Sequence, residues 1–302
     1  MPITGPKLDR PIGLANLLEV GLKSKPDEAA LVLLDRTWSW RELEEDATRL
    51  ARQYLAMGLA PGDRVASLLP NRGELLVHYL ACCKAALVAT PLNYRYQTPE
   101  IDHALEVGGA SLIIAHAERE DTLEASRFVP RLRLGRITFE ATSGPHRALE
   151  ELMAADGLAT PLPAPRADAP VFIFFTSGST GKPKGVTHTH ATFGWMIASA
   201  IAGLEITPDD VFLPATSASH VACSSLSFAG LAAGARVAMA RTFGPDELLP
   251  LLRRARPSLL CTLPAPLFGL VRDDGAQHDD FRSIRRCVSG GDKIAAELEH
   301  EY

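Results

Sequence analysis

The sequence predicts an α/β fold built from mostly parallel strands that are covered by helices. Short apolar runs, such as residues 65–69, alternate along the chain with longer segments in which apolar residues recur at helical spacing. Consecutive parallel strands need a crossover that is usually a helix, so this alternation is typical of helix-covered parallel sheets. A third observation is a change of composition near the middle of the chain, which indicates two successive subdomains.

This change of composition lies at residues 161–170, which read Pro-Leu-Pro-Ala-Pro-Arg-Ala-Asp-Ala-Pro. Proline-rich segments of this kind are stiff and extended rather than folded. We therefore divide the chain into an N-terminal α/β subdomain of residues 1–165 and a second α/β subdomain of residues 166–302. Each subdomain is expected to have its own sheet, which gives the layer order α/β/α/β/α.

Cap and turn residues justify the expected elements of the first half. Ser39 and Glu42 have capping-box spacing at the start of a long helix, and Gly58 is placed to end it. Asn71 and Glu74 repeat this capping pattern before the next helix. In order, we expect helix 14–22, strand 29–34, helix 39–58, strand 65–69, helix 71–83, strand 87–90, a helix that starts at Thr98-Pro99, strand 111–115 and a short helix at 148–155.

Apolar runs and helical periodicity resume after the linker. Residues 171–175 read as a buried strand, and Gly244-Pro245 precedes a helix whose last turn carries Arg253 and Arg254, where basic residues suit the helix dipole. In order, we expect strand 171–175, helix 190–202, strand 211–215, helix 221–232, strand 236–240, helix 246–255, strand 258–262, helix 266–272, strand 284–289 and a final helix from residue 293.

Length and composition exclude several classes of protein. The chain has 302 residues, of which 46% are hydrophobic and 22% charged, as is typical of a soluble globular protein of about two domains. A net charge of −5 provides no basic footprint for nucleic acid. The sequence shows no secretory signal and no apolar run of about 18 residues, so we expect a cytoplasmic protein without a membrane span. Its 5 cysteines lack C-x-x-C spacing and are expected to be reduced, mostly buried thiols.

One stretch carries most of the functional information. The apolar residues 171–175 run directly into a loop, Thr176 to Gly185, that consists of glycine, serine, threonine, Lys182, Pro183 and Lys184. Glycine lets backbone N–H groups approach an anion closely, and hydroxyl and ammonium groups add donors and positive charge. The composition therefore indicates a polyphosphate-binding loop, with a solvated turn as the alternative reading. The P-loop pattern is not met, because Pro183 stands where that pattern needs a hydroxyl.

The loop closely resembles the signature of AMP-forming acyl-CoA synthetases and related adenylate-forming enzymes, Thr-Ser-Gly-Ser-Thr-Gly-x-Pro-Lys-Gly. Weaker family segments occur in the same order around it, including Trp38-Ser39-Trp40-Arg41-Glu42-Leu43, Gly62-Asp63-Arg64-Val65-Ala66, Pro91-Leu92-Asn93 and Ser289-Gly290-Gly291-Asp292. On this resemblance the chain is identified as the N-terminal portion of such an enzyme. The fixed positions of the loop are occupied by Thr176, Ser177, Gly178, Ser179, Thr180, Gly181, Pro183, Lys184 and Gly185.

The resemblance implies a two-step reaction with ATP and coenzyme A. A substrate carboxylate attacks the α-phosphate of ATP and gives an acyl-adenylate and pyrophosphate, and coenzyme A then takes the acyl group. The carboxylate is already an anion, so the reaction needs positioning and charge neutralisation rather than a general base. Lys184 is the expected catalytic lysine because its position is the fixed one. ATP would be bound by Thr176, Ser177, Gly178, Ser179, Thr180, Gly181 and Lys184.

The resemblance also implies residues that contact the other parts of the substrates. His220 aligns with a histidine or aromatic residue that gates the carboxylate pocket, and Val221 lies beside it; a capping or core histidine is the alternative. Gly290, Gly291 and Asp292 would lie against the adenine, with a plain strand-to-helix turn as the alternative.

A metal site is not predicted within the chain. His188 and His190 have the spacing of two ligands on one strand face, but no carboxylate or cysteine lies near them in sequence. The resemblance implies that ATP is used with Mg²⁺ and that the glutamate assisting it belongs to a Thr-Glu motif beyond Tyr302. A ribose aspartate and a small C-terminal domain with the adenylation lysine would follow. We therefore expect this chain to be inactive or severely impaired by itself.

The predicted function is ATP-dependent activation of a fatty or aryl carboxylic acid and its transfer to coenzyme A in the complete enzyme. Two alternatives are an adenylation module that loads a carrier protein and a non-catalytic nucleotide-binding module. The sequence leaves the oligomeric state open, and a homodimer is one arrangement that it allows.

Overall fold

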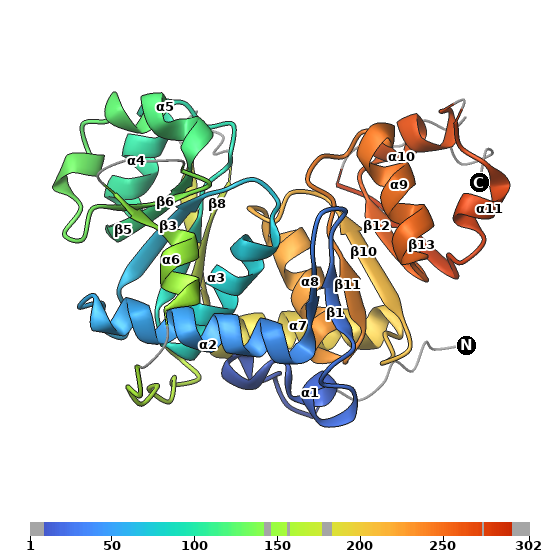
Figure 1. Ribbon diagram of the computed structural model, residues 1–302, viewed down its shortest axis with the longest axis horizontal. Helices are drawn as coiled ribbons and strands as arrows, with labels where there is room; N and C mark the ends of the chain where they lie inside the picture. Colours follow the sequence, from blue (N-terminus) through green and yellow to red (C-terminus); the bar gives the residue numbers. More distant parts are fainter. Residues whose placement is uncertain (1–8, 142–145, 156–157, 177–182, 274, 292–302) are drawn as a thin grey trace.

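The computed structural model describes residues 9–141, 146–155, 158–176, 183–273 and 275–291. These residues form two helix-covered sheets that stand side by side, with helices between them and on both outer faces (Figure 1). Most neighbouring strands in both sheets are parallel. The predicted α/β class and its layers are therefore confirmed.

The larger sheet has seven strands in the order β7-β6-β5-β3-β4-β8-β9. Its strands are parallel except for β9, which returns antiparallel along β8. The bounds are β3 (Arg64–Leu68), β4 (Val88–Pro91), β5 (Ala110–His116), β6 (Arg136–Phe139), β7 (Arg147–Ala148), β8 (Pro170–Thr176) and β9 (Lys184–Thr189).

The smaller sheet has six strands in the order β13-β12-β10-β11-β1-β2. Only the β1–β2 pair is antiparallel. The bounds are β1 (Ala29–Val32), β2 (Thr37–Ser39), β10 (Val211–Ala215), β11 (Arg236–Ala238), β12 (Leu259–Thr262) and β13 (Arg286–Ser289).

The expectation that each half of the chain has its own sheet is wrong. The hairpin β1–β2 from the first half lies beside β11 in the six-stranded sheet, whereas β8 and β9 from the second half extend the seven-stranded sheet beside β4. The division of the chain at residues 165 and 166 therefore does not coincide with the division between the sheets. Apolar runs identify strands, but they carry no information on which strands pair across a long sequence separation.

Alternate strand residues face different cores, as the two-residue period of a strand requires. Val65 of β3 and Phe212 of β10 belong to one large core between the sheets. Their neighbours Ala66 and Leu213 belong to two smaller cores under the outer helices. Each sheet is thus buried on both faces, which explains why its strands read as continuous apolar runs.

The helices between the sheets are α3 (Gly73–Lys84) and α8 (Val221–Ala232) (Figure 1). Every residue of α3 except Glu74 is buried. Tyr79 of α3 packs edge to face on Phe172 of β8, with ring centroids 5.4 Å apart, and Phe172 packs in the same way on Phe228 of α8 at 5.9 Å. Such pairs each contribute about 0.5–1.5 kcal/mol beyond the burial of their area.

The remaining helices cover the outer faces and the ends of the layers. Leucines of α4 and α9 pack under the seven-stranded and six-stranded sheets respectively. Their bounds, with those of the other helices, are α1 (Glu19–Ser24), α2 (Trp40–Ala56), α4 (Thr98–Gly108), α5 (Glu120–Glu124), α6 (Leu149–Ala154), α7 (His190–Leu204), α9 (Pro245–Ala255), α10 (Pro264–Val271) and α11 (His278–Phe281), and three short 3₁₀ turns lie at Leu14–Asn16, Ala117–Arg119 and Val129–Arg131.

The prediction of a helix cap from sequence was correct where the side chains bond to backbone groups close by in the chain. The Ser39 hydroxyl accepts from the Glu42 N–H at 3.2 Å, and the Glu42 carboxylate accepts from the Ser39 N–H at 2.7 Å, as the capping box predicted. The second expected cap is wrong, because α3 has Arg72 as its N-cap without a side-chain bond. Asn71 instead bonds to the loops of the other sheet.

Four strands were not predicted, β2, β6, β7 and β9. The last of them reads Lys-Gly-Val-Thr-His-Thr and lies at a sheet edge, and its one large apolar side chain, Val186, is exposed. The final helix expected from residue 293 lies outside the described residues.

A carboxylate ties three strands of the six-stranded sheet together at their starts. The Arg285 guanidinium, just before β13, donates to Asp210 at 2.9 and 2.8 Å, and the hydroxyl of Ser258, just before β12, donates at 2.6 Å. Burial alone would raise the pKa of Asp210, but these hydrogen bonds and those from Thr207 outweigh it and hold that pKa well below its usual value.

Replacing Arg285 with methionine leaves the Asp210 carboxylate without its cation. The depressed folded-state pKa stabilises the fold above the unfolded pKa of about 3.9, and this contribution is lost as the pH falls through the folded pKa. We expect the variant to lose about 2 kcal/mol of unfolding free energy at pH 7, less than a fully buried pair would lose, because Arg285 is partly exposed. Urea unfolding at pH 7 and pH 3 should show a smaller difference from wild type at pH 3.

The matched control is Arg166→Met, whose ion pair with Asp168 is exposed on both sides. It should unfold like wild type at both pH values. An equal loss for Arg285→Met at both pH values would contradict the electrostatic account and point to lost packing of the arginine stem.

Candidate active site

The predicted site residues lie at the carboxyl ends of parallel strands. β8 runs parallel to β4, and β4 runs parallel to β3, so Thr176 lies at the same edge of its sheet as the segment that follows β3. In the other sheet β12 and β13 run parallel to β10, so His220 and Gly290 follow strands that end at one edge. Open α/β sheets bind their ligands outside the carboxyl ends of their strands.

The two edges meet directly. Asn71, which follows β3, is hydrogen-bonded to the backbone of Thr216 and Ala218, which follow β10. Thr176 at the end of β8 and the loop after β10 therefore lie along one shared edge of the molecule, although they come from different sheets. This edge is the candidate active site.

The polyphosphate-binding loop is described only at its two ends. Thr176 at the end of β8 and Lys184 at the start of β9 are cross-strand partners, and both are exposed. Hydroxyl and ammonium groups placed side by side in this way can donate to a phosphate that lies across the end of the hairpin. The predicted residues Ser177, Gly178, Ser179, Thr180 and Gly181 lie outside the described residues.

Two residues behind the loop hold its second strand in place. The Nε2 atom of His103 on α4 donates to the Pro183 carbonyl at 2.9 Å, so this imidazole is protonated at Nε2. A Cβ on Gly185 would lie 2.9 Å from the Ile173 methyl on the neighbouring strand β8. Gly185 is thus needed for the close approach of β9 that brings Lys184 opposite Thr176.

His220 is the N-cap of α8 and Val221 is its first residue. The His220 side chain is exposed, yet the protein around it displaces enough water to lower the pKa of the imidazole below its usual value. His220 is therefore neutral at neutral pH. His220 at the start of a helix is consistent with both predicted roles, a residue that gates the carboxylate pocket and a helix cap. Its side chain, however, makes no cap hydrogen bond.

Gly290 and Gly291 follow β13 and are both exposed. Gly291 has φ +89°, in the left-handed region that favours glycine, and a Cβ there would lie 3.1 Å from Leu263. The two residues form an open turn at the same edge as His220. Asp292 lies outside the described residues, so the adenine contact stays a prediction.

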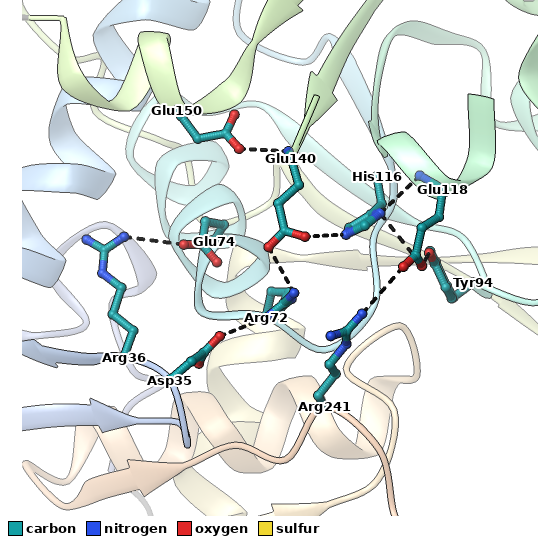
Figure 2. Close-up of polar contacts among 10 residues, drawn as sticks. All are labelled: Asp35, Arg36, Arg72, Glu74, Tyr94, His116, Glu118, Glu140, Glu150 and Arg241. Carbon is teal, nitrogen blue, oxygen red and sulfur yellow. Dashed lines mark hydrogen bonds and ion pairs between the residues drawn. The ribbon is translucent and has the colours of Figure 1, made fainter. Parts of the chain in front are cut away.

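A network of charges joins the two sheets beside this edge (Figure 2). Arg72 donates to Asp35 of the β1–β2 turn and to Glu140 at the end of β6, both at 2.8 Å. Glu140 also accepts from His116 Nε2 at 2.9 Å. At the other end, Arg241 after β11 lies 3.6 Å from Glu118. Cations and carboxylates of both sheets thus alternate across the junction.

Sequence patterns did not indicate this network or the role of His103. Arg72 is the N-cap of α3, His116 ends β5 and Glu140 follows β6, and none of them belongs to a recognisable motif. Glu140 has φ +57°, which is unfavourable for a residue with a side chain and is held by its bonds to Arg72 and His116. Only the strand order brings these side chains together.

The described residues do not fit a divalent cation at this edge. They contain no group of three or more histidine, cysteine, aspartate or glutamate residues that could hold a metal ion. His188 lies in β9 but His190 is the first residue of α7, so the two are not on one strand. Thr176 and Lys184 offer no carboxylate, and we derive no step through Mg²⁺ from this chain.

The fold and its edge are typical of α/β proteins that bind ligands outside the carboxyl ends of their strands. The chain matches the family of AMP-binding enzymes over residues 18–302. It therefore belongs to the AMP-binding enzyme family, as the loop sequence predicted.

Several curated proteins of similar sequence are named for the reactions that they catalyse. A feruloyl-CoA synthase from Amycolatopsis is 32% identical over 265 residues, which are 87% of this chain and 51% of that protein. The fatty acid–[acyl-carrier-protein] ligase ScoC of Streptomyces coeruleorubidus is 29% identical over 92% of this chain and 53% of its own length. The chain thus spans about half the length of these relatives.

Solved structures share the arrangement of both sheets. The N-terminal domain of FACL13 from Mycobacterium tuberculosis, solved with an inhibitor, aligns with a TM-score of 0.86 at 26% identity and covers 96% of this chain and 72% of that one. Apo MatB from Rhodopseudomonas palustris aligns with a TM-score of 0.83 at 26% identity over 96% of this chain and 56% of its own. Among the described residues, no helix is both long enough and apolar enough to cross a bilayer.

The tight contact at Gly185 gives a test of how the loop is held. Gly185→Ala forces the Cβ against a β-branched side chain that cannot rotate away, so we expect a loss of about 1–2 kcal/mol of stability and weaker ATP binding. Thermal unfolding and ATP titration measure the two effects.

The matched control is Gly203→Ala in α7, where the added Cβ meets nothing within 4 Å. Alanine should raise stability slightly at this helical position and leave ATP binding unchanged. Equal behaviour of the two variants would show that the approach of β9 to β8 does not depend on Gly185.

Proposed function

We propose that the complete protein containing this chain activates a fatty or aryl carboxylic acid with ATP and transfers the acyl group to coenzyme A. The observation that carries the proposal is the Thr176–Gly185 loop at the carboxyl end of β8 in a chain of the AMP-binding enzyme family. A loop of this composition suits a polyphosphate better than any other small ligand.

The first step needs positioning rather than acid–base chemistry. A carboxylate oxygen attacks the α-phosphorus of ATP, the bond from that phosphorus to the bridging oxygen breaks, and pyrophosphate leaves with the electron pair. No proton moves. Thr176 and Lys184, with the rest of the loop, bind the β- and γ-phosphates and neutralise the charge that develops on the leaving group. In the second step the sulfur of coenzyme A bonds to the acyl carbon, the bond from that carbon to the AMP oxygen breaks, AMP leaves with the electron pair, and the thiol proton is released to solvent.

His220 and Val221 form part of the wall of the carboxylate pocket in this proposal. Desolvation keeps His220 neutral at neutral pH, so it orients the acid by shape and hydrogen bonding rather than as a cation. Gly290, Gly291 and Asp292 provide the adenine side of the site. A Cβ on Gly290 would meet nothing within 4 Å, which leaves the backbone on that side open to the proposed ring.

The proposed acceptor of the acyl group and the proposed class of acid are based on the names of similar proteins. Feruloyl-CoA synthase and long-chain-fatty-acid–CoA ligase FadD13 use coenzyme A with an aryl and a fatty acid respectively. ScoC names an acyl carrier protein as its acceptor, so loading of a carrier protein is the second candidate. We place the protein in the cytoplasm, where ATP and coenzyme A are available. Its dimerisation stays a prediction.

Carboxylate-dependent ATP–pyrophosphate exchange tests the proposal on the complete gene product with a panel of fatty and aryl acids. Lys184→Ala removes the fixed cation of the loop, and we expect it to lower exchange by about 100-fold or more. Lys23→Ala is the matched control, since Lys23 pairs with Glu19 on the exposed surface of α1 and should leave exchange unchanged.

Exchange by wild type with at least one acid supports the proposed adenylation. Bound ATP without exchange across the panel would overturn it in favour of a non-catalytic nucleotide-binding module. Acyl transfer to a carrier protein but not to coenzyme A would support adenylation and change the acceptor.

The lowered pKa of His220 predicts the pH dependence of acid binding. Because burial lowers the folded-state pKa of His220 below 6.5, the midpoint of its titration lies below pH 6.5 and the imidazole is predominantly neutral above it. We expect the KM for the carboxylate to show no inflection between pH 6.5 and 8. An inflection in this range that disappears in His220→Gln would mean that the imidazole is charged in the working enzyme.

A further inference from the structure

Both the amide nitrogen and the amide oxygen of the Asn71 side chain form hydrogen bonds that link the two sheets. It is 4% exposed. Its Nδ2 donates to the carbonyls of Thr216 at 2.9 Å and Ala240 at 3.1 Å, and its Oδ1 accepts from the Ala218 N–H at 2.8 Å. All three partners are backbone groups that follow strands β10 and β11, whereas Asn71 follows β3.

The peptide groups around Ala218 are held by two further hydroxyls. The Ala218 carbonyl accepts from Tyr79 Oη of α3 at 3.0 Å and from Ser224 Oγ of α8 at 2.6 Å. Asn71 and Tyr79 belong to the segment that links β3 to β4. The residue Ala218 is therefore fixed at its N–H and at its carbonyl from the seven-stranded sheet, although it belongs to a loop of the six-stranded sheet.

This fixed segment determines where His220 lies. The His220 N–H donates to the Ser217 carbonyl at 3.0 Å, and the His220 carbonyl accepts from Ser224 at 3.2 Å in the first turn of α8. The turn from Thr216 to His220 is thus closed on itself and anchored at Thr216 and Ala218. A shift of these two peptide groups would carry His220 and Val221 with it.

We propose that Asn71 is a positioning residue that sets the carboxylate pocket against the polyphosphate-binding loop; this inference rests on the function proposed above. Asn71 is in the sheet that carries Thr176, and its three bonds reach the turn that carries His220. In-line attack requires the acid and the α-phosphate to be aligned, and they are bound by different sheets. The Asn71 bonds are directional and fix the alignment, which packing of apolar surfaces alone does not.

Only asparagine meets these requirements at position 71. The site needs two N–H donors and one acceptor at the reach of a single methylene, and the asparagine amide provides all of them. Aspartate keeps the reach but has no donors when ionised, and its carboxylate would face the carbonyl oxygens of Thr216 and Ala240. Glutamine has the amide but is longer by one methylene, so it would displace the turn.

Asn71→Asp tests the inference in the complete gene product. Displacement of reacting groups by about 1 Å costs on the order of 100-fold in rate. We expect kcat/KM for the carboxylate in pyrophosphate exchange to fall by about 100-fold, and the KM for ATP to stay within about twofold of wild type, because the phosphate loop is not touched. Hydrogen exchange followed by mass spectrometry should show faster exchange in peptides covering residues 216–224.

Two controls separate positioning from general damage. Asn16→Asp makes the same chemical change at an exposed asparagine and should resemble wild type in both measurements. Leu252→Ala opens a cavity in the fully buried core under α9 and lowers the unfolding temperature without touching the turn. It should leave the KM for both substrates and the exchange at residues 216–224 unchanged.

Each outcome bears on one of the two proposals. Faster hydrogen exchange at residues 216–224, together with a lower kcat/KM for the carboxylate and an unchanged KM for ATP, supports the positioning role. Normal carboxylate kinetics in Asn71→Asp, or a turn that exchanges as in wild type, would overturn that role while leaving adenylation intact. A rise of the KM for ATP well beyond twofold would overturn it as well, in favour of a structural role. Absence of exchange in wild type with every acid would overturn the proposed function, and with it the role given to Asn71.

Discussion

The arrangement of this protein depends on the polar junction that follows β3. Two sheets with separate outer cores share one apolar core between them, and apolar burial is strong but has no preferred direction. Direction comes from Asn71 and Arg72, two consecutive residues that bond to the loops of the other sheet. Both side chains are almost completely buried, and the backbone partners of Asn71 would be costly to leave unsatisfied, whereas Asp35, the partner of Arg72, is exposed.

The same junction explains why the ligand edge is where it is. Parallel strands place their carboxyl ends together, and the junction brings the edges of both sheets side by side. Arg72 and Arg241 lie at this edge but are engaged with carboxylates, as Figure 2 shows. Lys184, by contrast, is exposed at the start of β9. The charge that a phosphate would meet at the described part of the loop is therefore that of Lys184.

Sequence reasoning was reliable for features that a few neighbouring residues decide. The capping box of Ser39 and Glu42, the strand Val211–Ala215 and the helix Val221–Ala232 were predicted as the structure has them. It failed for Asn71, whose spacing to Glu74 satisfies a capping pattern but whose side chain has stronger partners across the sheets. It also failed for β9, because an edge strand with one exposed face does not need the apolar pattern of a buried one.

The sequence by itself determined the family, the α/β class and the loop from Thr176 to Gly185, because each rests on residues adjacent in the chain or on apolar periodicity. Tertiary structure alone decided that β1 and β2 join the later sheet and β8 and β9 the earlier one. It alone brought Asn71 to the turn before His220, and Arg72 to Asp35 and Glu140. These contacts span large sequence separations, and their partners are backbone groups or charged side chains at strand ends. Neither leaves a local pattern, so only the pairing of strands in space could reveal them.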